Sequence, residues 1–145
     1  LTEHDLIIRR ALVSAKGREV KHTGDGIMAS FSDASDALRA AVQMQQAFAR
    51  AEVDGARLEV RIGINSGEPV AQDEQLYGLA VNVARRLCDA AEPGAILVSD
   101  VVRGLTMGKA FAFDSAGEQA FKGIEAPMAV SSLRWTAEDS PGPDG

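Results

Sequence analysis

The sequence predicts an α+β domain in which helices pack on a mixed or antiparallel sheet. Three observations lead to this fold class. Helical segments alternate with hairpin-like strands along the chain, an order that fits an α+β sandwich better than a doubly wound parallel sheet. Residues 58–64 (LEVRIGI) repeat with a period of two, as a strand with one buried face does. The chain has 145 residues, 46% of them hydrophobic, which is enough for one domain with its own core.

Each expected element rests on hydrophobic periodicity and on turn or cap residues at its ends. Gly17 is read as the C-cap of the first helix, and Asp25 as the tip of the first hairpin. The expected helices span residues 3–15, from the cap at 32–35 to about 50, 78–91, and 99–105. The expected strands span residues 19–23, 27–31, 58–64, 69–71, 95–98, 111–113, 120–123 and 129–135. A strand preceding residue 3 would complete a βαββαβ core.

The domain is expected to span residues 1–135, followed by a disordered tail over residues 136–145, which are polar and rich in Pro and Gly. A net charge of −6 argues against a nucleic-acid partner but leaves a small anion possible. The single cysteine, Cys88, excludes an internal disulfide and fits a reducing, cytoplasmic location. Since no apolar run approaches the ~20 residues of a membrane span, we expect no membrane contact from this segment.

The first candidate site is the segment KHTGDG, residues 21–26, with Asp25 at the hairpin tip. A carboxylate between glycines, which allow close approach, suits Mg²⁺, an ion that prefers one or two carboxylates with phosphate and water oxygens. The alternative is that Gly-Asp-Gly serves only as turn sequence.

The second candidate is the pair Asn82 and Arg86, four residues apart on one face of a helix. An amide beside a guanidinium can orient a sugar and neutralise a phosphate. The alternative is a solvated helix face.

Lys122, before Gly123, is a third candidate, and the alternative for it is an ordinary surface charge.

Four segments together resemble the class III adenylate and guanylate cyclase catalytic domains of the bacterial type. The likeness runs from about residue 3 to Trp135. The segments are, in order, EVKHTGDGIMASF (19–31), VRIGINSG (60–67), LYGLAVNVARRL (76–87) and EPGAILVS (92–99).

The resemblance implies a ferredoxin-like α+β core and an active site formed by a head-to-tail homodimer. It implies that Asp25 is the second of two metal-binding aspartates, which hold two Mg²⁺ or Mn²⁺ ions. The first aspartate would lie on an opening strand, outside this chain, because only 24 residues precede Asp25. The resemblance also implies that Lys21 recognises adenine. Gln75 stands where many adenylate cyclases have an aspartate that accepts from the adenine amino group, and its side-chain carbonyl can also accept.

By the same resemblance, Asn82 positions the ribose, Arg86 stabilises the transition state at the α-phosphate, and Lys122 holds the terminal phosphates. The implied activity is an adenylate cyclase that converts ATP to cyclic AMP and pyrophosphate, within a protein that carries other regulatory domains. Three alternatives stay open: a guanylate cyclase, a catalytically silent dimerisation or nucleotide-sensing module, and an unrelated ferredoxin-like binding domain whose motifs are turns and caps.

Overall fold

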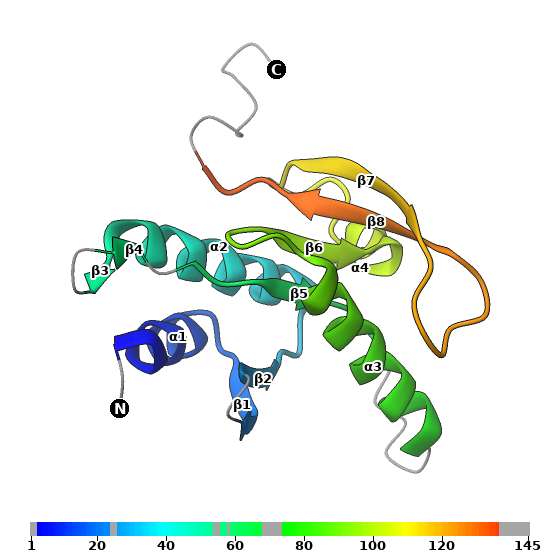
Figure 1. Ribbon diagram of the computed structural model, residues 1–145, viewed down its shortest axis with the longest axis horizontal. Helices are drawn as coiled ribbons and strands as arrows, with labels where there is room; N and C mark the ends of the chain where they lie inside the picture. The colour runs from blue at the N-terminus through cyan, green and yellow to red at the C-terminus, as the bar shows by residue number, and fades with distance from the viewer. Residues whose placement is uncertain (1–2, 24–25, 54–55, 58, 68–73, 137–145) are drawn as a thin grey trace. The chain divides into compact units, whose positions relative to one another are not determined.

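A computed structural model describes residues 3–23, 26–53, 56–57, 59–67 and 74–136, with the side chains of 21–23, 52–53, 56–57 and 74–77 outside the description (Figure 1). The chain divides into two compact units, Leu1–Val60 and Arg61–Gly145. No helix in the described ranges is long and apolar enough to cross a membrane. The expected disordered tail lies outside the described residues, except for Thr136.

The first unit contains two helices and two short antiparallel pairs of strands. Its elements are α1 (Glu3–Ser14), β1 (Arg18–Thr23), β2 (Gly26–Ser30), α2 (Ala34–Arg50), β3 (Glu52–Val53) and β4 (Ala56–Arg57). Helices α1 and α2 pack together, and their buried residues Ile7, Ile8, Leu12 and Phe48 form the core of this unit. The apolar residues of β2, Ile27 and Ala29, pack against the same core.

Helix α1 ends in a Schellman motif, in which two backbone N–H groups bond back to carbonyls of the last turn. The Gly17 N–H donates to the Leu12 carbonyl at 2.7 Å, and the Lys16 N–H donates to the Val13 carbonyl at 3.3 Å. The left-handed residue of the motif is Lys16, with φ of 63°. The sequence assigned this role to Gly17, which was wrong. Gly17 is instead needed for space, because a Cβ there would lie 2.6 Å from Cζ of Phe31.

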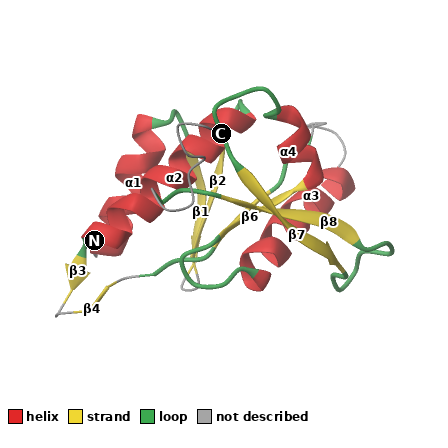
Figure 2. Cartoon of the chain, turned by 90° about the horizontal axis from the view of Figure 1, so that it is seen from above, coloured by secondary structure: helices red, strands yellow, loops and turns green. Residues whose placement is uncertain are grey.

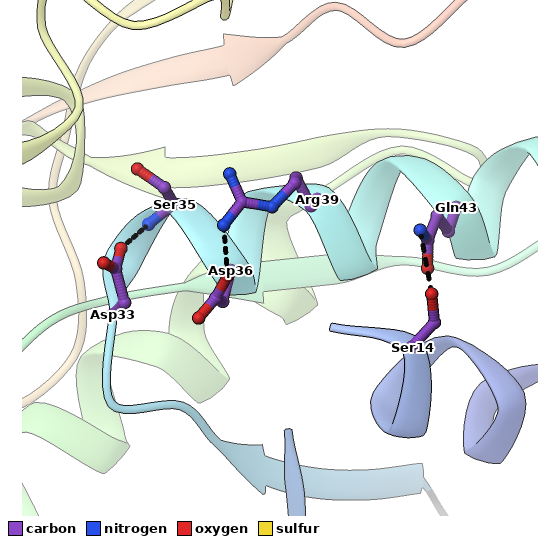
Figure 3. A network of polar contacts seen from close by, with 6 residues as sticks. All are labelled: Ser14, Asp33, Ser35, Asp36, Arg39 and Gln43. Carbon is purple, nitrogen blue, oxygen red and sulfur yellow. Dashed lines mark hydrogen bonds and ion pairs between the residues drawn. The ribbon is translucent and has the colours of Figure 1, made fainter. Parts of the chain in front are cut away.

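Helix α2 begins at the predicted cap. The side chain of Asp33 accepts a hydrogen bond of 2.7 Å from the Ser35 backbone N–H, satisfying one of the free donors of the first turn (Figure 3). One turn later Arg39 forms an ion pair with Asp36. Further along, the Gln43 side chain donates to the Ser14 hydroxyl at 3.3 Å and so links α2 to the end of α1 (Figure 3).

The second unit is built on a four-stranded mixed sheet in the order β5-β6-β8-β7. Its elements are β5 (Ile62–Ile64), α3 (Glu74–Ala90), β6 (Ile96–Ser99), α4 (Asp100–Leu105), β7 (Phe113–Gln119) and β8 (Met128–Leu133). Strand β5 pairs parallel with β6, and the other two pairs are antiparallel, so β6, β8 and β7 run side by side (Figure 2). The predicted α+β fold with a mixed sheet is therefore confirmed.

The core of this second unit lies between α3 and the central strands. It consists of Val83, Leu87 and Ala91 from the helix side and Leu97 and Val130 from the sheet. All four residues of β6 are buried, as expected for a central strand. The indole N–H of Trp135, after β8, donates to the Gly94 carbonyl at 2.8 Å, which fastens the end of the sheet to the turn between α3 and β6.

Helix α3 and strand β5 approach each other to backbone contact at Gly63. A Cβ at this position would overlap the Ala84 carbonyl and the Cys88 amide nitrogen, and would lie 2.9 Å from the Cys88 Cα. A glycine inside a strand commonly marks such a close approach. Gly63 therefore sets the distance between the helix and the sheet.

Several predicted boundaries were wrong. Of the described residues in the strand predicted over 58–64, only 62–64 form a strand, and the short pair β3–β4 before them was not predicted. Helix α3 begins at Glu74, four residues before the predicted Gly78, so this glycine lies inside the helix. Residues 121–124 form a turn rather than a strand, and the strand expected at 111–113 begins at Phe113. The strand predicted over 69–71 lies outside the described residues.

The left-handed backbone of Lys16 gives a first test of the fold. Replacing Lys16 with Gly removes the steric cost that a side chain pays at φ of 63°. We expect the free energy of unfolding to rise by about 0.5–1 kcal/mol. Urea denaturation followed by circular dichroism measures this. A loss of stability in Lys16→Gly would contradict the Schellman assignment.

The contact at Gly63 gives a second test. Gly63→Ala must push α3 away from β5, and we expect a loss of about 1–3 kcal/mol in stability, the usual cost of overpacking. Gly104→Ala is the matched control, because Gly104 lies in a helix and its Cβ would meet open space; it should be neutral or stabilising by up to about 1 kcal/mol. Equal midpoints for the two variants in thermal unfolding would show that the close approach is wrong.

Candidate active site

Helix α3 carries two of the predicted site residues, Asn82 and Arg86, both partly buried. They are one turn apart, so they share one side of the helix. Val83 and Leu87, each one position later, lie in the core of the second unit. The core packing of Val83 and Leu87 thus fixes the rotation of α3, and with it the direction in which Asn82 and Arg86 project.

The opposite side of α3 is held by the segment that runs from Arg61 through β5 to Gly67. The Cys88 thiol donates to the Arg61 carbonyl at 3.3 Å, and the Asn65 amide donates to the Ala80 carbonyl at 3.1 Å. A Cβ on Gly67 would lie 2.6 Å from the Cβ of Ala80. The helix and this segment therefore run antiparallel, and small residues at Ala80 and Ala84 allow the close approach.

The third residue of the second unit, Lys122, sits in a tight turn. The Ile124 N–H donates to the Phe121 carbonyl at 3.1 Å, and Gly123 has φ of 85°, the value that a type II turn requires at its third position. Phe121 and Ile124 pack against the same core as Val83 and Leu87. The two ends of the turn are thus anchored beside α3, while Lys122 at its tip is exposed.

The turn and the helix meet at Asn82. A Cβ on Gly123 would lie 3.9 Å from Nδ2 of Asn82, so the turn backbone passes next to this amide. The predicted residues Asn82 and Lys122, forty positions apart in the sequence, are therefore brought to one region of the second unit.

Arg86 has an unusual environment for a cation. Its Nε atom is buried and has no hydrogen-bond partner among the described residues. A buried donor without a partner costs about 1–3 kcal/mol, more when it belongs to a charged group. An anion that accepts from this guanidinium would remove that cost, so the arrangement suits a phosphate oxygen.

The other predicted site residues belong to less fully described segments. Lys21 lies on β1 in the first unit, and its backbone pairs with Met28 of β2. Asp25, between β1 and β2, lies outside the described residues, and so do the side chains of Lys21 and Gln75. In the part of the chain that is described, no three His, Cys, Asp or Glu side chains gather to hold a metal ion. The metal and purine contacts thus stay predictions.

Sequence reasoning missed the residues that support α3. Gly63 and Asn65 were noticed only as part of a strand and a turn. A signal for Gly63 was present, since a glycine inside a strand often marks the close approach of another backbone. Nothing in the sequence marks Asn65, because its partner is a backbone carbonyl 15 residues later.

Burial raises the pKa of the Cys88 thiol above its usual value, and the charge of the neighbouring Asp89 raises it further. A raised pKa leaves less thiolate, the reactive form, at a given pH. We therefore expect iodoacetamide to alkylate Cys88 in the native protein several-fold more slowly at pH 8 than in the urea-unfolded protein.

No other thiol interferes with this measurement, because the chain has a single cysteine. The rate in the native protein should climb with pH over a range that lies above that of the unfolded protein. Equal rates in the two states would contradict the packing of α3 on the Arg61 carbonyl.

Comparison with known proteins places these features in a family. The profile of the adenylate and guanylate cyclase catalytic domain matches residues 1–133. A putative adenylate cyclase of Rhizobium meliloti is 34% identical over 86% of this chain and 22% of its own length. An uncharacterized protein of Mycobacterium tuberculosis is 34% identical over 99% of this chain and 38% of its own. The chain thus spans less than half the length of these curated relatives.

Solved structures agree. A crystal structure titled adenylate/guanylate cyclase/hydrolase from Silicibacter pomeroyi is 42% identical, with a TM-score of 0.77 over 90% of this chain and 79% of that one. An adenylate cyclase of Trypanosoma brucei has a TM-score of 0.78 over 94% of this chain and 78% of that one, at 18% identity, a likeness of fold alone. The core therefore has the ferredoxin-like cyclase fold, and the chain belongs to the family of class III adenylate and guanylate cyclase catalytic domains.

Proposed function

We propose that this domain converts ATP to cyclic AMP and pyrophosphate at the interface of a head-to-tail homodimer. Membership of the cyclase family supports nucleotide cyclase chemistry. The observation that carries the proposal is the buried, unpartnered Nε of Arg86, among the described residues, on the same side of α3 as Asn82. The Arg86 Nε–H can donate to a phosphate oxygen, and the Asn82 amide can bind the sugar that carries this phosphate.

In this proposal each residue has one task in an in-line attack of the 3′-hydroxyl on the α-phosphorus. Asn82 holds the ribose so that the hydroxyl faces the phosphorus, a gain in orientation. Arg86 donates to the phosphoryl oxygens, on which negative charge grows as the P–O bond to pyrophosphate breaks. Lys122, on its exposed turn beside Asn82, holds the terminal phosphates that leave as pyrophosphate.

The hairpin β1–β2 supplies the remaining contacts. Asp25 would hold the two Mg²⁺ or Mn²⁺ ions together with a second carboxylate, and a carboxylate between glycines fits the oxygen ligands these ions prefer. When bound, the ions would lower the pKa of the 3′-hydroxyl and offset the charge of the leaving group. The backbone of Lys21 is fixed by its pairing in β1, four residues before Asp25. Its ammonium would donate to adenine, and the Gln75 carbonyl would accept from the adenine amino group.

A homodimer is proposed from membership of the cyclase family, because the resemblance to that family implies an active site shared by two protomers. A head-to-tail pair would bring the hairpin of one protomer to the α3 helix of its partner.

The name of the Rhizobium meliloti relative, a putative adenylate cyclase, supports ATP over GTP as the substrate. Further domains beyond this segment, with regulatory roles, are proposed from the greater length of the curated relatives. A cytoplasmic location follows from the need for ATP.

A pair of neighbouring arginines gives the sharpest test. Arg86 is partly buried on the proposed nucleotide side of α3, whereas Arg85 beside it is exposed. In the full-length protein with ATP and Mn²⁺, we expect Arg86→Ala to lower kcat by about 100-fold or more, the usual loss when one preorganised donor is removed. Arg85→Ala should keep kcat within about twofold of wild type, because the exposed Arg85 is not one of the oriented donors to the transition state.

Assays with GTP and calorimetric titration with a non-hydrolysable ATP analogue complete the experiment. Cyclisation of GTP in preference to ATP would make the domain a guanylate cyclase. Binding of the analogue with no turnover of either nucleotide would identify a silent nucleotide-sensing module. Equal kcat values for Arg85→Ala and Arg86→Ala would refute the role of Arg86.

A further inference from the structure

Asn65, immediately after β5, makes a hydrogen bond that the backbone of α3 does not require. Its Nδ2 donates to the Ala80 carbonyl at 3.1 Å, in a partly buried position. Ala80 lies in the interior of α3, where each carbonyl already accepts from the N–H four residues later. The Asn65 bond is therefore an additional one, and it joins the segment after β5 to the helix.

The other contacts on this side of α3 are weaker in direction. Gly63 approaches Ala84 and Cys88, and Gly67 approaches Ala80, without directional bonds. The Cys88 thiol donates to the Arg61 carbonyl at 3.3 Å, but a thiol is a weak donor. The glycine contacts set how closely the helix approaches the strand, but apolar contact is non-directional and does not by itself select one position along the helix axis. A hydrogen bond is directional and weakens steeply when its angle or length changes. The Asn65 amide thus defines the axial position of α3.

That axial position matters for the residues on the far side of the helix. Asn82 is two residues after Ala80, roughly 200° around the helix axis, and Arg86 is one further turn along. A helix moves as a rigid rod over this length, so a shift at Ala80 displaces both side chains together. Asn82 also lies next to the fixed turn at Gly123, so such a shift changes the spacing between the helix and Lys122.

We infer that Asn65 is a positioning residue for nucleotide cyclisation, which sets the axial position of α3 and thereby of Asn82 and Arg86. The inference rests on the function proposed above for those two residues. A misplacement of about 1 Å in an oriented reaction costs up to ~100-fold in rate. Contacts that bind the nucleotide equally well in the ground state and in the transition state depend less on exact placement. The shift therefore lowers kcat more than it raises KM.

The test replaces Asn65 with Asp, which has the same shape but presents a carboxylate oxygen to the Ala80 carbonyl instead of an N–H. The matched control is Gln43→Glu, because Gln43 also donates an amide N–H across two elements, to Ser14 in the first unit (Figure 3). Both variants lose one amide and gain one negative charge. Asn65→Ala is a milder second variant, since the Ala80 carbonyl keeps its bond within the helix.

Two readouts are measured on the full-length protein: steady-state kinetics with ATP, and hydrogen exchange of the α3 amides by mass spectrometry. We expect Asn65→Asp to lower kcat by at least 10-fold with KM within about twofold, and to speed exchange in α3. Asn65→Ala should show a smaller change in the same direction, and Gln43→Glu neither. In an Asn82→Ala background the effect of Asn65→Asp on kcat should shrink, because coupled residues are not additive.

The inference would be overturned if the α3 amides of Asn65→Asp exchanged at the wild-type rate. It would also be overturned if Asn65→Asp lowered kcat by the same factor in the Asn82→Ala background as in the wild-type protein. If the wild-type protein cyclises neither ATP nor GTP, the proposed function fails on its own. The exchange data then decide separately whether Asn65 holds the helix.

Discussion

The contact between α3 and β5 at Gly63 is the constraint on which the second unit depends. No side chain separates the two backbones there. The helix can therefore lie close enough for Val83 and Leu87 to reach Leu97 and Val130 in the core. With the core on one side and β5 on another, the remaining side of α3 is left to Asn82 and Arg86. The core residues of α3 and the two residues of the proposed nucleotide site thus lie on different sides of a single helix.

The buried Nε of Arg86, which has no hydrogen-bond partner among the described residues, costs stability, and in the proposed function a bound phosphate would remove that cost. A protein selected only for folding would pair or expose the buried Nε, as most buried polar atoms are paired. A family of nucleotide cyclases has a reason to keep such a donor ready, because a donor that is already oriented need not reorganise during the reaction. The turn at Phe121–Ile124 has partly buried apolar ends that pack against the core, while Lys122 at its tip is exposed.

Much of the fold could be predicted from local signals. The bounds of α1 and α2, the hairpin β1–β2 and the capped α4 follow from periodicity and caps that act within a few residues. The failures have long-range causes. The start of α3 was placed at Gly78, but the helix begins at Glu74 and continues through this glycine, although glycine is a poor helix former. The left-handed residue after α1 is Lys16, and Gly17 is needed for its close approach to the ring of Phe31, which the local sequence does not reveal.

The candidate site divides in the same way. Asn82 and Arg86 could be predicted as neighbours because their spacing matches one helical turn. The proximity of Asn82 to the turn at Gly123 could not be predicted, because it depends on two segments that meet only through the core. The support from Gly63 and Asn65 was equally hidden, because a strand pattern shows which face is buried but not which backbone atom lies opposite.

The bond from Trp135 to the Gly94 carbonyl has a consequence for observing this domain in solution. Trp135 is the only tryptophan in the chain, so its emission reports on a single place, the junction between the end of α3, the start of β6 and the end of β8. An indole that is partly buried and donates to a carbonyl emits at a different wavelength from one in water. Trp135 is thus an intrinsic fluorescent probe near the C-terminal end of α3, the helix that carries Asn82 and Arg86.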